Sequence, residues 1–291
     1  MNLPMHIIEL DMTKMDTFQR CGELLNLRFN RDLTTQTKNI YLDAGDLTHV
    51  GTERYYNALK QGQHYDDAVH EMLIAIDTRA ALESDLPDYE VTHIKRVLEL
   101  YCDHWRVEDQ GWKIDFIEEP FSYVLYEDDT FRIQFSGKID LIKTDFRYTN
   151  LPVDTKTFRK DFEVLRMNNQ FINYAIATNS NWLMVNRIGL HELDTSKQKP
   201  LHERFKRIML SYDDVYKEQW KRNMIIWAMK YWDSLSTNTW ELNFAGCFAY
   251  GRKCDFYDVC DTSGQEAKAF KLKDFKIGEK WDVAKPLGTR K

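Results

Sequence analysis

Residues 131–141 have the sequence FRIQFSGKIDL, in which apolar and polar side chains alternate. Successive side chains of a strand project to opposite faces, so this period of two predicts a half-buried β-strand. Residues 121–125 alternate in the same way, and the acidic segment Glu127-Asp128-Asp129 separates the two stretches. We therefore expect two antiparallel strands joined by a turn.

The residues around this hairpin predict further strands and helices. Residues 65–108 are expected to be helical, because apolar residues such as Ile94, Leu98 and Tyr101 recur at the spacing of one helix face. The later elements are a strand at 151–157, a helix around 167–178, strands at 182–188 and 205–211, and a long helix capped by Asp213 or Asp214. This order predicts an α/β fold with a central mixed β-sheet flanked by helices.

The composition limits the class of protein. Hydrophobic residues make up 43% of the 291 residues, which is enough for a buried core and excludes overall disorder. The net charge of −6 gives no protein-wide positive field that would attract nucleic acid or anionic lipid. Residues 268–291 differ, because eight lysine or arginine residues and three acidic residues give them a net charge of +5. Any contact with nucleic acid must therefore be local.

The N-terminal residues lack the features of a targeting segment. They have no basic start, no long apolar run and no small-residue cleavage site, and the apolar runs elsewhere carry polar breaks. We therefore expect a cytoplasmic protein that does not contact a membrane.

Three chemically active side chains fall on two of the expected strands. Asp140 projects to the polar face of its strand, and Asp154 and Lys156, two residues apart, share a face of the next strand. Acids on neighbouring strands can hold a hard divalent cation, and a lysine beside them can orient or deprotonate a water. The pattern alone is weak, since acids on strands are also found simply solvated.

The same residues resemble the PD-(D/E)XK nuclease superfamily. The resemblance is to its RecB-like branch that carries an iron–sulfur cluster, similar to CRISPR-associated adaptation exonucleases and the AddB nuclease domain. The matching segments, in family order, are Gly45-Asp46-Leu47-Thr48-His49, Gly137-Lys138-Ile139-Asp140, Val153-Asp154-Thr155-Lys156 and Gln170-Phe171-Ile172-Asn173-Tyr174. In the family the histidine of the first segment precedes a helix.

The resemblance implies a restriction-endonuclease-like core and a role for each matched residue. Asp140 and Asp154 would ligate Mg²⁺ or Mn²⁺, and His49 and the Thr155 carbonyl would complete the protein ligands. Lys156 would position the attacking water. Gln170 and Tyr174 would contact the DNA backbone or support the lysine. From the residues alone, His49 could also be an ordinary buried or solvated histidine, and Gln170 and Tyr174 an ordinary helix edge. Glu118 or Glu119 matches an acid of the preceding strand in the family, without a clear role.

The cysteines form a second pattern. Three of the five lie close together, at Cys247, Cys254 and Cys260, which in a reducing compartment favours metal binding over disulfides. Structural zinc sites usually draw on two close pairs, which are not found here. The resemblance implies that Cys21 joins these three to hold a [4Fe–4S] cluster, which clamps the C-terminal segment. The spacing after Cys247 is longer than the family's usual one, zinc stays an alternative, and three unliganded cysteines are another.

The resemblance also implies the domain organisation and the function. The whole chain, 1–291, would form a single nuclease domain: a helical elaboration at about 53–110, a catalytic core at about 115–235, a cluster-binding segment at about 244–262 and a basic tail at 268–291. It would hydrolyse DNA, as an exonuclease on single-stranded ends. Local phosphate contacts are expected from Arg159, Lys160, Arg204, Lys206, Arg207, Arg252 and Lys253.

Other functions fit parts of the same pattern. One alternative is a non-catalytic DNA-binding or assembly module stapled by the cluster, and another is a metal-dependent enzyme acting on a different phosphate ester. The family also suggests a helicase or recombination partner. A compact chain without helicase motifs would suit a phage-encoded protein in a bacterial host cytoplasm.

Overall fold

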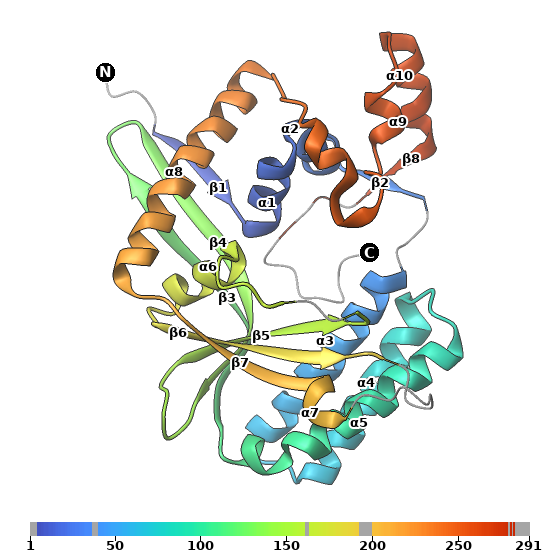
Figure 1. The fold of residues 1–291 in the computed structure, drawn as a ribbon, viewed down its shortest axis with the longest axis vertical. Coiled ribbons are helices and arrows are strands. Elements are labelled where there is room, and N and C mark those ends of the chain that lie inside the picture. Colours follow the sequence, from blue (N-terminus) through green and yellow to red (C-terminus); the bar gives the residue numbers. More distant parts are fainter. Residues whose placement is uncertain are drawn as a thin grey trace. The chain divides into compact units, whose positions relative to one another are not determined.

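The computed structural model in Figure 1 describes residues 5–36, 40–160, 163–191, 200–278, 280 and 282. The chain divides into two compact units. Unit 1 comprises Met1–Thr37, Ser122–Gly137 and Glu218–Ala284, and unit 2 comprises Lys38–Phe121, Lys138–Lys217 and Lys285–Lys291. The strands β3 (Lys113–Glu127) and β4 (Phe131–Thr144) and the helix α8 (Asp214–Thr237) have residues in both units. The division into one domain with elaborations stays a prediction.

Unit 2 contains most of the mixed sheet. Its strands follow in the order β4, β5 (Leu151–Phe158), β6 (Trp182–Gly189) and β7 (Phe205–Ser211), with β3 paired to β4. The β5–β6 pair is parallel, while β4–β5 and β6–β7 are antiparallel. The strand β5 therefore lies between two neighbours, and its polar residues are held within the sheet rather than at an edge.

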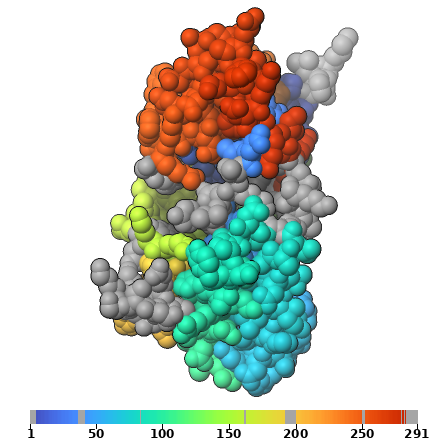
Figure 2. Space-filling view, turned by 90° about the vertical axis from the view of Figure 1, so that its right-hand side faces the viewer, coloured from blue at the N-terminus to red at the C-terminus, as the bar shows by residue number. Residues whose placement is uncertain are grey.

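Three helices supply the core of unit 2. The helices α3 (Ile40–Lys60), α4 (Tyr65–Glu83) and α5 (Asp88–Gln110) pack together, and α4 and α5 form much of the cyan to green surface in Figure 2. Their apolar side chains form one buried cluster with strand residues such as Leu151 and Val153. The helix expected at 65–108 is two helices, because Pro87 disfavours helical backbone in the residue before it.

The remaining helices of unit 2 are short. The helix α6 (Asn169–Ala177) begins after Asn168, whose side chain accepts hydrogen bonds from the backbone N–H groups of Gln170 and Phe171. This cap satisfies free N–H groups of the first turn and fixes the start of the helix. The helix α7 (Leu201–Arg204) leads directly into β7.

Unit 1 combines the chain's N-terminal residues with its C-terminal segment. The strand β1 (His6–Leu10) pairs in parallel with β4, and β2 (Leu33–Thr35) pairs antiparallel with β8 (Phe275–Ile277). Residues far apart in sequence are thus joined by backbone hydrogen bonds. The other elements, besides α8, are α1 (Met12–Arg20), α2 (Gly22–Leu25), η1 (Asn26–Asn30), η2 (Phe244–Gly251), α9 (Tyr257–Cys260), α10 (Gln265–Lys271) and η3 (Leu272–Asp274).

The mixed sheet flanked by helices confirms the predicted fold class. The hairpin, the strands after it and the helix around 167–178 lie where the periodicity places them. Asp213 caps α8, since its side chain accepts from the backbone N–H of Tyr216 at 2.8 Å. One expectation was wrong: the segment Gly45 to His49 lies inside α3 and does not precede a helix. Part of the basic tail, including 283–291, lies outside the described residues.

None of the helices in the described part of the chain combines the length and the hydrophobicity needed to cross a membrane.

Candidate active site

Two neighbouring strands of unit 2 bring the predicted acids and lysine together. Asp140 lies on β4, and its Oδ2 accepts a hydrogen bond of 2.8 Å from the backbone N–H of Thr155 on β5. Asp154 is only 1% exposed. The ammonium group of Lys156 lies 3.1 Å from Oδ1 and 3.0 Å from Oδ2 of Asp154. A buried carboxylate is thus paired with a partly exposed ammonium group in the middle of the sheet.

The helix α6 holds the lysine from its other side. Lys156 Nζ donates to Gln170 Oε1 at 2.9 Å, and Gln170 Nε2 donates to the hydroxyl of Tyr174 at 2.8 Å. Gln170 and Tyr174 are one helical turn apart, so both reach the same side of α6. The structure therefore joins three of the predicted residues in one chain of hydrogen bonds that fixes the direction of the ammonium group.

A histidine and a second acid complete the constellation. His49 Nδ1 on α3 lies 3.6 Å from Asp140 Oδ2. Glu118 on β3 has a φ of +50°, a left-handed conformation that is uncommon for a residue other than glycine. Ligand atoms of His49, Glu118 and Asp140 all lie within 4.8 Å of one another. One imidazole nitrogen and several carboxylate oxygens are a donor set that suits Mg²⁺ or Mn²⁺.

The electrostatics of this group are those of crowded, buried acids. Burial raises the pKa of Asp140, and burial followed by the neighbouring Asp140 carboxylate raises the pKa of Glu118. Burial also raises the pKa of Asp154 to about 6, although Lys156 opposes the shift. For Lys156, burial disfavours the charged form, but the Asp154 and Asp140 carboxylates outweigh it and raise the pKa. Burial and the charge of Lys156 lower the pKa of His49, which favours the neutral, ligating imidazole.

Comparison with known families assigns the chain to a superfamily. The model of the PD-(D/E)XK nuclease superfamily matches residues 9–261. The chain belongs to this superfamily. Membership implies metal-dependent nuclease activity with DNA as the substrate, and the acid cluster of unit 2 is the place where the described residues could bind the metal.

Comparisons with individual proteins add little to this assignment. No curated protein matches the nuclease chain. Among solved structures, the crystal structure of SSO0001 is 12% identical and aligns over 51% of this chain and 69% of its own. Its TM-score of 0.28 is too low to support an argument about the fold.

The predicted metal ligands of the nuclease fall into three groups. His49 and Asp140 lie in the cluster of possible ligand atoms. Asp154 is next to it but its carboxylate faces Lys156. The backbone N–H of Thr155 donates to Asp140. That the Thr155 carbonyl oxygen ligates the metal ion stays a prediction. The sequence left open whether Glu118 or Glu119 is the matching acid and gave it no role, and strand periodicity gives no sign of the positive φ at Glu118.

A buried hydrogen-bond network supports the site from the other side of β5. Asn186 on β6 donates to the hydroxyl of Tyr101 at 2.7 Å and lies 3.4 Å from Thr155 Oγ1. The Tyr101 hydroxyl accepts from Arg207 at 3.2 Å, and Arg207 also pairs with Asp109. Because buried polar groups must find partners, this network holds Thr155, and with it the N–H bonded to Asp140, in one position.

The network corrects one expectation about DNA contacts. Arg207 was expected to meet phosphate, but its side chain is only 4% exposed and it is paired with Asp109 and Glu108. Arg204 is fully buried and donates to the backbone oxygens of Gly189 and His191. Both arginines are structural, whereas Lys206, next to Arg207 on β7, is exposed.

The predicted cluster cysteines all belong to unit 1. Cys21, Cys254 and Cys260 lie in one small apolar cluster, and the N–H of Cys254 donates to the carbonyl of Cys247 at 2.8 Å. Burial, then Glu23 and the neighbouring thiols, raises the pKa of Cys260 to about 11. Within the described residues no three cysteine sulfurs lie within 4.8 Å of one another. An iron–sulfur cluster therefore stays a prediction. Cys102 is a buried apolar residue, as expected.

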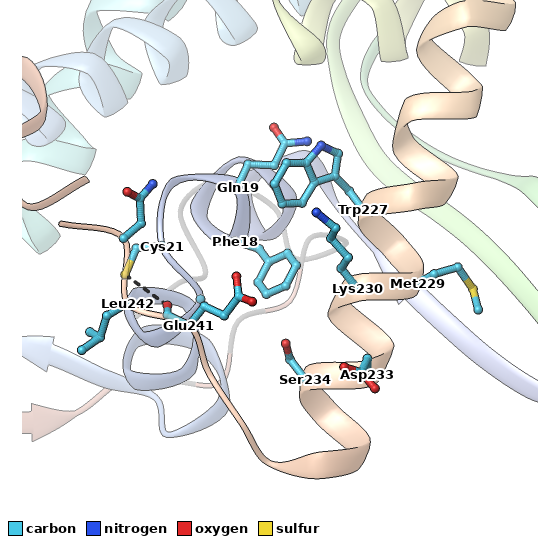
Figure 3. Close-up of a pocket in the computed structure, with 12 residues that line it drawn as sticks. Phe18, Gln19, Cys21, Trp227, Met229, Lys230, Asp233, Ser234, Glu241 and Leu242 are labelled. Carbon is cyan, nitrogen blue, oxygen red and sulfur yellow. Dashed lines mark hydrogen bonds between the residues drawn. The ribbon is translucent and has the colours of Figure 1, made fainter. Parts of the chain in front are cut away.

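A separate cavity lies beside Cys21 in unit 1. It has a volume of about 580 Å³ and lies between α1, α8 and residues 241–243 (Figure 3). Phe18, Trp227 and Lys230 line it, while the thiol of Cys21 points to the backbone of Glu241, with its sulfur 3.8 Å from the carbonyl oxygen. Cys21, one of the predicted cluster ligands, therefore also lines this cavity.

Proposed function

We propose that this chain is a Mg²⁺- or Mn²⁺-dependent deoxyribonuclease that degrades single-stranded DNA from its ends. The observation that carries the proposal is the convergence of His49, Glu118 and Asp140 beside the Asp154–Lys156 pair. Such a set can hold a divalent ion next to an ammonium group, and the ion can supply an acidified water and stabilise the charge that develops on a phosphodiester.

Each residue has a defined part in the proposed reaction. His49, Glu118 and Asp140, with Asp154 beside them, would hold the ion, which when bound supplies an acidified water and neutralises charge on the phosphate. Lys156, fixed by Asp154 and Gln170, holds the attacking water against the phosphorus and stays protonated, since its pKa is raised. Tyr174 fixes the amide of Gln170 and so the lysine.

Features of unit 1 support a preference for single strands. Phe244, Phe248 and Phe270 are 79%, 63% and 67% exposed in the C-terminal segment, which forms the orange to red surface in Figure 2. Lys253 and Lys273 lie over aromatic rings of the same segment. Exposed aromatic rings interleaved with lysines are typical of surfaces on which unpaired bases stack.

We also propose that Cys21, Cys247, Cys254 and Cys260 hold a [4Fe–4S] cluster, with zinc as the alternative. Their gathering from both ends of unit 1 supports a metal centre with thiolate ligands. Protein purified without oxygen should be brown and contain iron and sulfide in nearly equal amounts, whereas a colourless zinc protein would contradict the cluster. We further propose a cytoplasmic location, and the family resemblance suggests a phage origin and a helicase or recombination partner.

The proposed activity is tested on end-labelled DNA. The protein should release short products from linear single strands with Mn²⁺, leave circular single strands intact and be inactive with EDTA. Lys156→Ala should abolish the release, while the control Lys113→Ala, at a lysine of β3 whose side chain is 77% exposed, should keep it. Cleavage of circles would show an endonuclease, and absence of cleavage with every divalent ion would contradict the function.

A further inference from the structure

A second lysine lies inside the acid cluster and has no part in the reaction described above. Lys138 is on β4, two residues before Asp140, so both side chains project to the same face of the strand. Its side chain is only 11% exposed, and its Nζ lies 2.6 Å from Oε2 of Glu118. Lysines are seldom buried so deeply unless a charged partner holds them.

The partner of Lys138 is itself one of the possible metal ligands. Glu118 is 13% exposed, and its carboxylate belongs to the group formed with His49 and Asp140. Its positive φ directs the side chain from β3 toward β4 at the cost of a sparsely populated backbone conformation. The same carboxylate therefore faces two cations in turn: the ammonium group of Lys138 and a divalent ion at the three-residue cluster.

The two cations compete through charge as well as contact. When the Lys138 ammonium group is paired with Glu118, it neutralises one of the acids that would attract the ion. It also repels the ion at short range in a poorly hydrated site. Lys156 cannot relieve this competition, because it is bound to Asp154 and Gln170. Once an ion occupies Glu118, Lys138 needs another anion, and the nearest anion that a nuclease brings is a phosphate of its substrate.

We propose that Lys138 is a positioning residue that holds Glu118 when no divalent ion is bound and contacts a DNA phosphate when the ion is bound. This inference rests on the proposed function for its second half only. It predicts that DNA and metal favour each other's binding, because DNA draws Lys138 away from Glu118, and thermodynamic linkage makes the effect reciprocal.

The first test measures Mn²⁺ binding without DNA, by calorimetry or by the electron paramagnetic resonance of free Mn²⁺. Lys138→Met should bind Mn²⁺ about tenfold more tightly than the wild type, which corresponds to ~1.4 kcal/mol. Lys138→Arg keeps the ion pair and should bind as the wild type does, and so should the control Lys113→Met, at a lysine whose side chain is 77% exposed. In a Glu118→Gln background, Lys138→Met should give a smaller gain, because the competition for the Glu118 carboxylate is gone and only the repulsion between the ammonium group and the ion remains.

The second test adds a phosphorothioate single strand that resists cleavage. The strand should tighten Mn²⁺ binding by the wild type and by Lys138→Arg, but not by Lys138→Met. Wild-type or weaker Mn²⁺ affinity in a folded Lys138→Met variant would overturn the inference while leaving a Mn²⁺-dependent nuclease intact. If no variant binds Mn²⁺, the metal centre and the proposed function fail together.

Discussion

Replacing a proposed catalytic acid should make the metal-free protein more stable. Asp154 is 1% exposed, and burial raises the pKa of its carboxyl from an ordinary 3.8 to about 6 despite the adjacent Lys156. The folded state therefore favours the neutral acid more than the unfolded state does. Ionisation of Asp154 therefore destabilises the folded state. This destabilisation is absent at low pH, grows as the pH rises from about 4 to 6, and is complete above that.

The size of the effect follows from the pKa difference. About two pKa units at 1.36 kcal/mol each give at most ~3 kcal/mol of destabilisation at pH 7.5. Asp154→Asn has nearly the shape of the neutral acid and carries no charge. Urea unfolding in EDTA at pH 7.5 should therefore show a variant that is up to ~3 kcal/mol more stable than the wild type. At pH 4 the two proteins should unfold with nearly equal free energies.

Bound metal should make the wild type more stable than Asp154→Asn. Mn²⁺ stabilises only a protein that binds it when folded, so a saturating concentration should raise the stability of the wild type and leave Asp154→Asn nearly unchanged. The reasoning would be refuted if Asp154→Asn were less stable than the wild type in EDTA at pH 7.5. It would also be refuted if the difference in unfolding free energy between the two proteins were the same at pH 4 and pH 7.5. Asp154 would then be a structural ion-pair residue and not a destabilising acid of the site.

Three further outcomes are expected. Asn186→Ala should lower the unfolding free energy by ~1–3 kcal/mol in urea titrations, because it removes one of the buried hydrogen bonds to the Tyr101 hydroxyl and breaks the link from that network to Thr155. It should also slow cleavage, and unchanged stability would contradict the supporting network. Cys21→Ser should lose iron and be proteolysed faster, whereas Cys102→Ser, at a buried site outside the cluster, should keep its iron. Deletion of 285–291 removes three positive charges and should reduce the slope of log DNA affinity against log salt concentration by about two. An unchanged slope would exclude residues 285–291 from DNA binding.

Local periodicity was enough to predict the strands that carry the site. The alternation at 131–141 and the spacing of Asp154 and Lys156 depend only on the geometry of a strand, and the structure places these residues as that geometry requires. The turn of helix between Gln170 and Tyr174 is equally local, and the hydrogen bond between them follows from it.

The parts that were missed depend on long-range pairing or on the backbone. The parallel pairing of β1 with β4 joins residues more than a hundred positions apart, and nothing in either strand specifies its partner. The position of Glu118 depends on a positive φ that no sequence periodicity reveals. Arg204 and Arg207 were taken for surface residues because arginine is mostly exposed, yet backbone carbonyls and Asp109 supply the partners that allow their burial.

The most direct test of the metal-dependent active site is cleavage of single-stranded DNA by the wild type and Asp140→Asn, side by side at one Mn²⁺ concentration. Asp140 joins the possible ligand cluster to the backbone of β5. The wild type should release end label with Mn²⁺ and stop on addition of EDTA, while Asp140→Asn should remain folded, as judged by circular dichroism, and release none. Release by Asp140→Asn at the wild-type rate would contradict the assignment of the active site.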